Sequence, residues 1–242
     1  MNVYSISISS CWNSSRHTDG YEMIEELVEL GFDRIELSHG IRVSLVPGIL
    51  KAMEEEKVQV GSIHNFCPLP SGVQHAAPNF YQPSAPHEGE RNLWINYTLK
   101  TLEFAQAVGA SRVIMHSGSA VFFLGDPFKK AETIQDHWIE ESKPLEALRE
   151  DPVFSKAIQS GLKKIRKKED KTAPRLSQMY QPVVESAQEK GLKLCIENRE
   201  GLTELPTDAR IPEFLEALGG PETVTYWHDC GHAQIKQVQG VQ

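Results

Sequence analysis

The sequence predicts an α/β fold of the TIM (β/α)8-barrel type, with six βα units present in this chain. Helix-type and strand-type segments alternate from end to end, an order that requires a parallel sheet with right-handed crossovers. Neither a GxGxxG nor a GxxxxGK[ST] motif occurs, which disfavours a nucleotide-binding doubly wound sheet. A helix that ends on glycine and runs into a short β-rich strand recurs at 26–39, 104–118, 186–198 and 214–229.

The helices are predicted from start signals and apolar periodicity. Asp19, followed three residues later by Glu22, is typical of a capping box, and Ile24 and Leu27 then mark one apolar face. Further helices are expected at 46–56, 91–108 and from Pro212 to Leu218. We interpret their apolar faces as core.

Six strands are expected between these helices. Each of four glycines stands where a helix C-cap needs a left-handed residue before the chain turns into a strand, namely Gly31, Gly109, Gly191 and Gly219. The strands themselves are predicted near 3–8, 33–38, 58–64, 112–117, 192–197 and 223–229.

Two connections are much longer than the usual βα loop of about 2–6 residues. Residues 65–92 hold five prolines and lack helical periodicity, and in a barrel they would lie on the active-site face. The insertion 119–178 contains an expected helical stretch at 131–170. Its charge run, 162–171, is interpreted as a solvated helix face, with phosphate binding or oligomerisation as alternatives. We treat 1–242 as a single domain.

Composition narrows the class of protein. Of the 242 residues, 40% are hydrophobic, and the net charge of −8 argues against a surface built for nucleic acid. The four cysteines form no CxxC pair, which disfavours disulfides or a thiolate zinc site and favours reduced thiols in the cytoplasm. No secretion signal or membrane-spanning stretch is visible in the sequence.

Side chains that can bind metals end four successive predicted strands: His64, His116, Glu197 and Asp229. Because strand ends converge on one pocket in a barrel, this repetition predicts a shared site. Strand alternation favours Asp229 over His228 as the inward residue. His232 lies three residues after Asp229, in DCGH, where the intervening glycine would let the imidazole approach the same pocket.

An Asp/Glu/His set of this kind suits a transition-type divalent ion. We expect Zn²⁺ or Mn²⁺, with Mg²⁺ and Co²⁺ as alternatives. The predicted metal ligands are Glu197, Asp229, His232, His64 and His116.

The ordered segments SIHNF, VIMHSG, LCIENREG and HDCGHA resemble the xylose isomerase-like TIM barrels. That superfamily comprises sugar and sugar-phosphate isomerases and epimerases, together with endonuclease IV-type enzymes. The resemblance covers essentially the whole chain, weakly in 119–178. It implies that Glu197 and Asp229 match the shared carboxylate ligands, and that the three histidines match those of the multi-zinc endonuclease branch.

The resemblance also implies a histidine ligand on a seventh strand and a glutamate ligand on an eighth. The sequence ends at Gln242, after the sixth predicted strand. We therefore expect a C-terminally incomplete barrel, in which those two ligands have no candidate.

The leading hypothesis is a metal-dependent isomerase or epimerase that acts on a sugar, or a similar hydroxy-carbonyl compound, through an enediolate. Glu197 and His116 are the predicted catalytic residues. Arg199 and Glu200 are expected to orient substrate, and Trp12 and Phe66 to form an apolar wall.

Two alternatives remain open. One is an endonuclease IV-like zinc phosphodiesterase of abasic DNA, and the other is a non-catalytic or truncated barrel. The leading hypothesis expects a small sugar-like partner, no nucleic acid and no membrane, and it leaves a homo-oligomer open.

Overall fold

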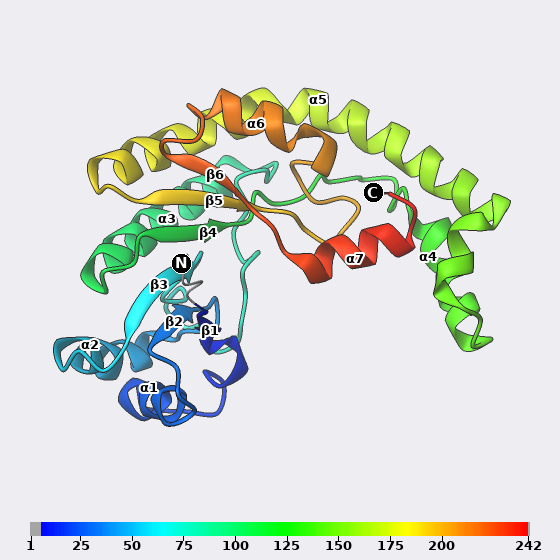
Figure 1. Ribbon diagram of the computed structural model, residues 1–242. Coiled ribbons are helices and arrows are strands. Elements are labelled where there is room, and N and C mark those ends of the chain that lie inside the picture. The colour runs from blue at the N-terminus through cyan, green and yellow to red at the C-terminus, as the bar shows by residue number, and fades with distance from the viewer. Residues whose placement is uncertain (1–5, 242) are drawn as a thin grey trace, which may run out of the picture.

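In a computed structural model that describes residues 6–241, six parallel strands form one curved sheet in sequential order (Figure 1). The strands are β1 (Ile8–Ser9), β2 (Arg34–Leu37), β3 (Gln59–His64), β4 (Arg112–Met115), β5 (Lys193–Glu197) and β6 (Val224–Trp227). The helices are α1 (Gly20–Glu29), α2 (Val46–Glu54), α3 (Glu88–Ala107), α4 (Lys129–Glu140), α5 (Pro152–Glu189), α6 (Ile211–Ala217) and α7 (Cys230–Val238).

The predicted α/β fold with alternating helices and strands is confirmed. The first expected strand began at residue 3, and its residues 3–5 lie outside the described residues. Among residues 6–241, β1 and β6 each pair with a single neighbour and not with one another, so these strands do not close a barrel. In the same range, every helix is too short or too polar to serve as a membrane span.

The core lies between the curved sheet and the helices along its outer side (Figure 1). In β5, Leu194, Cys195 and Ile196 are all buried, as is usual for a parallel strand covered on both faces. Leu27 of α1 and Leu102 of α3 are fully buried beneath the outer helices. The sheet is therefore held in place by its helical cover as much as by strand pairing.

The helical insertion differs from the single stretch expected at 131–170. Helix α4 ends at Glu140, and a 3-10 segment (Leu145–Glu150) precedes α5, which continues to Glu189. Pro144 and Pro152 mark the break: Pro144 directly precedes the 3-10 segment, and Pro152 is the first residue of α5, a position that favours proline. Helix α5 itself continues through Pro174 and Pro182. Asp151 then caps α5 by accepting hydrogen bonds from the backbone N–H groups of the next turn.

The four glycines predicted to end helices all have left-handed backbones, with φ between +64° and +100°. The long connection 65–92 is shorter than expected, because α3 begins at Glu88. Residues 65–87 remain without a helix or a strand of the sheet.

Helix α5 packs closely against the buried side chain of Phe128 at Gly161. A Cβ added at Gly161 would lie 2.3 Å from the ring of the buried Phe128, whereas one added at Gly89 in α3 meets nothing within 4 Å. We expect Gly161→Ala to lower the free energy of unfolding by about 1–3 kcal/mol through overpacking. Gly89→Ala, the matched helical control, should cause no loss. Urea denaturation followed by circular dichroism measures both, and equal stability of the two variants would contradict the predicted packing.

Candidate metal centre

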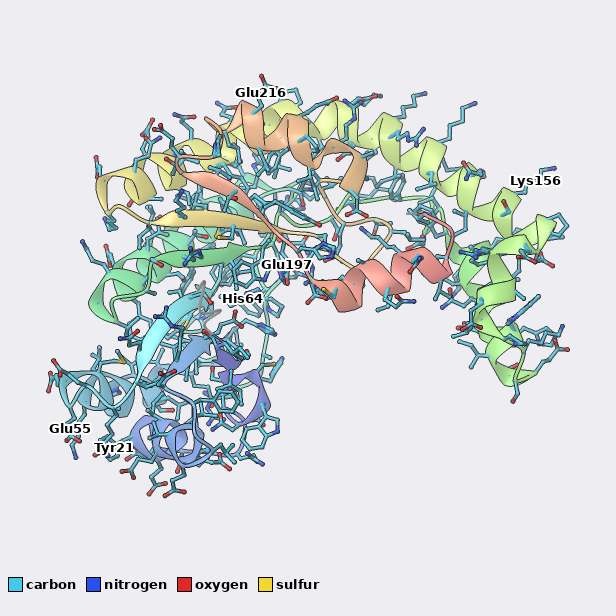
Figure 2. All side chains as sticks on the ribbon, viewed as in Figure 1. Tyr21, Glu55, His64, Lys156, Glu197 and Glu216 are labelled. Carbon is cyan, nitrogen blue, oxygen red and sulfur yellow. The ribbon has the colours of Figure 1, made fainter. Side chains whose placement is uncertain are left out.

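A cavity of about 500 Å³ lies at the C-terminal ends of the strands. Figure 2 shows Glu197, the last residue of β5, close to His64, the last residue of β3. The structure brings seven of the predicted site residues to this cavity: Glu197, His64, His116, Asp229, His232, Arg199 and Glu200.

The carboxylate of Glu197 is the centre of the site. It is only 7% exposed, and its Oε2 lies 2.7 Å from His116 Nε2 and 3.6 Å from His64 Nε2. Burial disfavours the charged form and raises the pKa of Glu197, but the contacts with His116 and His64 outweigh it and hold that pKa well below its usual value. Glu197 is therefore an ionised, nearly buried carboxylate.

The histidines around it are held by oxygen atoms on their far side. His64 Nδ1 lies 3.1 Å from the carbonyl of Asn65, and His232 Nδ1 lies 2.8 Å from the carbonyl of Asn198. A neutral ring that donates from Nδ1 presents a lone pair at Nε2. In both rings Nδ1 is therefore the donor to a carbonyl and Nε2 is the nitrogen directed into the cavity, an orientation that metal-binding histidines share.

His116 is placed in the same way. Its Nδ1 lies 3.1 Å from Asn79 Oδ1, while its Nε2 faces Glu197. Burial lowers the pKa of His116 to about 3, so the ring is neutral at pH 7 and carries one proton. That single proton can be donated to Asn79 Oδ1 or to Glu197 Oε2, but not to both. If a cation were bound at Nε2, Nδ1 could donate to Asn79 while Glu197 contacted the cation.

Asp229 and His232 are brought to the site by the start of α7. The Asp229 carboxylate caps this helix and accepts a hydrogen bond from the His232 backbone N–H at 2.7 Å. Asn198, directly after β5, donates to the Asp229 carbonyl at 2.9 Å and accepts from its N–H at 2.6 Å. His228 instead contacts Tyr226 and is absent from the residues that line the cavity.

These residues form two groups that could hold a metal ion, and Glu197 belongs to both. One group is His64, His116 and Glu197, and the other is Glu197, Asp229 and His232. Within each group the candidate ligand atoms lie within 4.8 Å of one another. Two imidazoles with a carboxylate, or two carboxylates with an imidazole, match the donors preferred by Zn²⁺ and Mn²⁺.

Arg199 supplies the main fixed positive charge of the site. Its guanidinium contacts Glu197 at 3.0 Å, Glu200 at 3.1 Å and Glu204 at 3.1 Å. Its Nη1 also lies 3.5 Å from His232 Nε2. The Arg199 guanidinium therefore lies between Glu197 and His232, two candidate ligands of the second group. A cation bound by these two residues would repel it.

The segment that carries these contacts is joined to the loop after β4. Ala120 N–H donates to the Thr203 carbonyl and Leu205 N–H to the Gly118 carbonyl, both at 2.8 Å. The loops after β4 and β5 thus form a short antiparallel bridge beside the site.

Sequence reasoning missed several residues at this site. Glu36 and His39 line the cavity from β2 and the loop behind it, and the His39 ring packs edge-on against His64 with ring centroids 4.8 Å apart. The inward position of Glu36 could have been found from strand alternation. Asn79 could not, because it lies in an irregular loop whose path leaves no periodic signal.

The two residues predicted to form an apolar wall do not line the cavity. Phe66 is fully buried and packs edge-on against Tyr81 and Tyr97 in the core. Trp12 is 51% exposed, and the Arg16 guanidinium covers its ring at 4.2 Å. The prediction placed both residues on loops that follow strands. That position gives the region of the fold in which a residue lies, but not the direction in which its side chain points.

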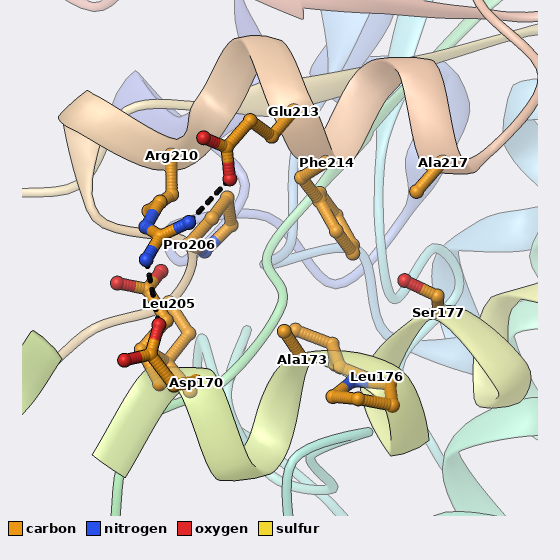
Figure 3. Close-up of a pocket in the computed structure, with 12 residues that line it drawn as sticks. Asp170, Ala173, Leu176, Ser177, Leu205, Pro206, Arg210, Glu213, Phe214 and Ala217 are labelled. Atoms are coloured by element: carbon orange, nitrogen blue, oxygen red, sulfur yellow. Dashed lines mark hydrogen bonds and ion pairs between the residues drawn. The ribbon is translucent and has the colours of Figure 1, made fainter. Parts of the chain in front are cut away.

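A second cavity, of about 340 Å³, lies between α5 and α6 on the outer side of the fold (Figure 3). Its walls are largely apolar and include Leu176 and Phe214, and Arg210 at its rim pairs with Asp170 at 2.6 Å. Neither of the two metal-competent groups found in the described residues lies there. The strand-end cavity is therefore the candidate functional site.

No protein-family model matches the sequence, and no curated protein matches it. Solved structures do. The chain is similar to a D-tagatose 3-epimerase-like protein (17% identity, TM-score 0.53), over 95% of this chain and 66% of that protein. It is also similar to 3-keto-D-glucoside 4-epimerase from E. coli, with 13% identity and a TM-score of 0.63 over 97% of this chain and 72% of that protein. A third similar structure is D-psicose 3-epimerase from Clostridium cellulolyticum, with 13% identity and a TM-score of 0.55 over 96% of this chain and 65% of that protein.

The chain has the fold of these sugar epimerases. This similarity confirms the resemblance to xylose isomerase-like barrels at the level of fold. The chain spans about two thirds of the length of these neighbours.

Acid is expected to destabilise the metal-free protein through its buried histidines. His116 has a lowered pKa in the folded state, so between about pH 6.5 and 3 the unfolded chain binds a proton that the folded chain does not. Stability conferred by neutral His116 is thus present above the unfolded pKa and is lost as the pH falls. The loss between pH 7 and 5 should be about 2 kcal/mol, and His39, whose pKa burial lowers to about 4, adds to it.

Urea denaturation with a chelator present, at both pH values, measures this loss. His116→Asn should reduce the pH dependence, whereas His137→Asn, on the exposed surface of α4, should leave it unchanged. A wild-type stability that is flat from pH 7 to 5 would contradict the expectation.

Proposed function

We propose that the protein is a metal-dependent isomerase or epimerase of a sugar or similar hydroxy-carbonyl compound. One observation carries this proposal. Three imidazoles, His64, His116 and His232, present Nε2 towards carboxylates while an oxygen faces each Nδ1. Hydrogen bonding of this kind prepares histidines as ligands.

The residues fit a divalent ion. Glu197 and Asp229 would supply carboxylate oxygens, and the histidines would supply imidazole nitrogens. When bound, such an ion draws electron density from adjacent substrate oxygens and makes the neighbouring C–H acidic. Zn²⁺ and Mn²⁺ are the ions we propose, because mixed nitrogen and oxygen donors suit them.

The protein's own groups would then move and hold protons. Glu197, ionised at neutral pH, can accept the proton from the carbon beside the carbonyl and return it to the neighbouring carbon on the same face, which gives isomerisation. Epimerisation would need, in addition, a second group that delivers a proton from the opposite face. His116 is neutral and carries a single proton, so it would either bind the ion through Nε2 or donate a hydrogen bond to a substrate oxygen, but not both. Arg199 and Glu200 would orient the substrate hydroxyls at the mouth of the cavity, because Arg199 holds Glu200 beside His232.

The structural neighbours support a sugar as the substrate class. Their names record action on D-tagatose-like, 3-keto-D-glucoside and D-psicose substrates. Each of these is a hydroxy-carbonyl compound, and epimerisation beside a carbonyl proceeds by proton removal and return. We extend that chemistry to this chain as a proposal.

Metal binding tests the ligand set. Asp229→Asn should weaken Zn²⁺ or Mn²⁺ binding by more than the roughly 10–100-fold that loss of an outer-shell partner costs. His228→Asn is the matched control one residue away, and it should bind like the wild type because His228 contacts Tyr226 instead. Isothermal titration of the dialysed protein measures both variants. Wild-type protein that takes up no ion would favour the non-catalytic alternative.

Proton exchange tests the reaction. Metal-loaded protein in D₂O should introduce deuterium next to the carbonyl of a ketose, with NMR following a panel of ketopentoses and ketohexoses. Glu197→Gln should abolish the exchange, since the amide cannot accept the carbon proton. Exchange at the wild-type rate in Glu197→Gln would overturn the role of Glu197.

A second candidate function is hydrolysis of a phosphodiester in abasic DNA. The shared position of Glu197 in two ligand groups favours it, because two ions bridged by one carboxylate can activate water and clamp phosphate oxygens. The net charge of −8 opposes it. Incision of abasic duplex DNA by the metal-loaded protein, without deuterium exchange into ketoses, would establish this function in place of the first.

A further inference from the structure

A second surface of the protein joins exposed apolar side chains to a row of lysines. The loop after β4 exposes 83% of Phe123 and essentially all of Leu124. Beside it lies one face of α5. We call this combination the β4-loop surface and define it by the residues that line its hollow, of which the argument uses Phe122, Phe123, Leu124, Lys164, Lys167, Lys168 and Lys171.

The four lysines share a helix face because each of them lies three or four residues from two of the others, as in the pairs 164/167, 164/168, 167/171 and 168/171. None of them is paired with a carboxylate in the part of the chain that the structure describes. Lys168 is drawn over the Phe123 ring, 6.0 Å from its centroid. In a chain of net charge −8, this is a concentrated patch of uncompensated positive charge.

The lysine row and the apolar loop are not independent surfaces. They enclose a hollow of about 470 Å³ whose wall is apolar on the loop side and cationic on the helix side. Two exposed apolar side chains, Phe123 and Leu124, thus lie directly beside the cationic face of α5. Adjacent exposed apolar side chains that are rimmed by charged groups are a common feature of interaction sites.

We propose that the β4-loop surface docks the protein on an anionic phospholipid bilayer. Phe123 and Leu124 enter the boundary between headgroups and acyl chains, and the four lysines contact lipid phosphates. This matches the two-part chemistry of peripheral membrane contacts, in which buried apolar area and attraction to anionic lipid act together. The contact is peripheral and reversible, and it requires no membrane-spanning helix.

The character of the tip selects a bilayer over other polyanions. Leu124 is its most exposed side chain, and an aliphatic group gains from hydrocarbon but cannot stack on bases as single-stranded nucleic acid would require. A protein partner would need a matching pocket for both side chains. A bilayer offers apolar volume and negative charge without such a pocket.

Vesicle flotation with the full chain tests the proposal. Binding to phosphatidylcholine vesicles that contain about 30% phosphatidylglycerol should exceed binding to pure phosphatidylcholine by roughly tenfold or more. It should weaken as salt is added, because exposed charges are screened beyond about 10 Å at 0.1 M. Equal binding to the two kinds of vesicle would overturn the proposal.

Two double variants separate the contributions. Phe123→Ser with Leu124→Ser should lower vesicle affinity about tenfold or more through lost apolar burial. Lys164→Glu with Lys167→Glu should remove the preference for anionic lipid. The matched controls change as many exposed apolar residues, Leu30→Ser with Val43→Ser, and as much charge, Lys51→Glu with Lys193→Glu, on other elements. Both controls should float like the wild type.

Other occupants give distinct results. Wild-type flotation of the Phe123/Leu124 variant would overturn insertion of the loop. A concentration-dependent dimer in sedimentation that this variant abolishes would make the surface an interface between copies, and it would overturn bilayer docking. Tighter binding to a single-stranded oligonucleotide than to anionic vesicles would do the same. Unchanged urea midpoints of all four variants establish that each is folded.

Discussion

The ionised carboxylate of Glu197 is the constraint around which this fold is arranged at its functional end. A charge that is only 7% exposed is expensive unless several groups compensate it. Those groups come from separate elements: His64 ends β3, His116 follows β4, and Arg199 follows β5. The compensation therefore requires the strand ends to converge, and a sheet that lost its curvature would leave the charge unpaired.

The residues that face the cavity are held by hydrogen bonds to a further set of residues behind them. Three asparagines hold the histidines and Asp229 from outside: Asn65 and Asn79 at two of the rings, and Asn198 between the end of β5 and the start of α7. Asn65 and Asn198 contact the rings through their backbone carbonyls, whereas Asn79 at His116 and Asn198 at Asp229 use the side-chain amide, which offers a donor and an acceptor without adding charge. The charged groups are thereby oriented without a further change in the net charge of the site.

The distribution of charge gives the chain two different surfaces. The whole molecule is acidic, and its candidate metal centre gathers carboxylates around a single arginine. The lysine row of α5 stands apart from this pattern. Its charges are solvated, as a charged helix face usually is, but the exposed Phe123 and Leu124 lie next to them.

Much of this arrangement could be predicted from sequence, because parallel strands leave strong local signals. Glycine C-caps, apolar runs and metal-competent residues at four successive strand ends were enough to locate Glu197 and its neighbours. The direction of Phe66 was not predictable, because its loop turns it into the aromatic core beside Tyr97. Nor was the break before α5, where Pro144 and Pro152 divide what helical periodicity alone joins.

The bridge between the loops after β4 and β5 connects the β4-loop surface to the candidate metal centre through a short piece of backbone. Gly118 and Ala120 lead directly into the exposed tip, and their partners Leu205 and Thr203 flank Glu204, which holds the guanidinium of Arg199. A displacement of the tip would therefore pull, through two backbone hydrogen bonds, on the segment whose glutamate holds Arg199. The shortest mechanical route from the outer rim to the candidate metal centre is this bridge.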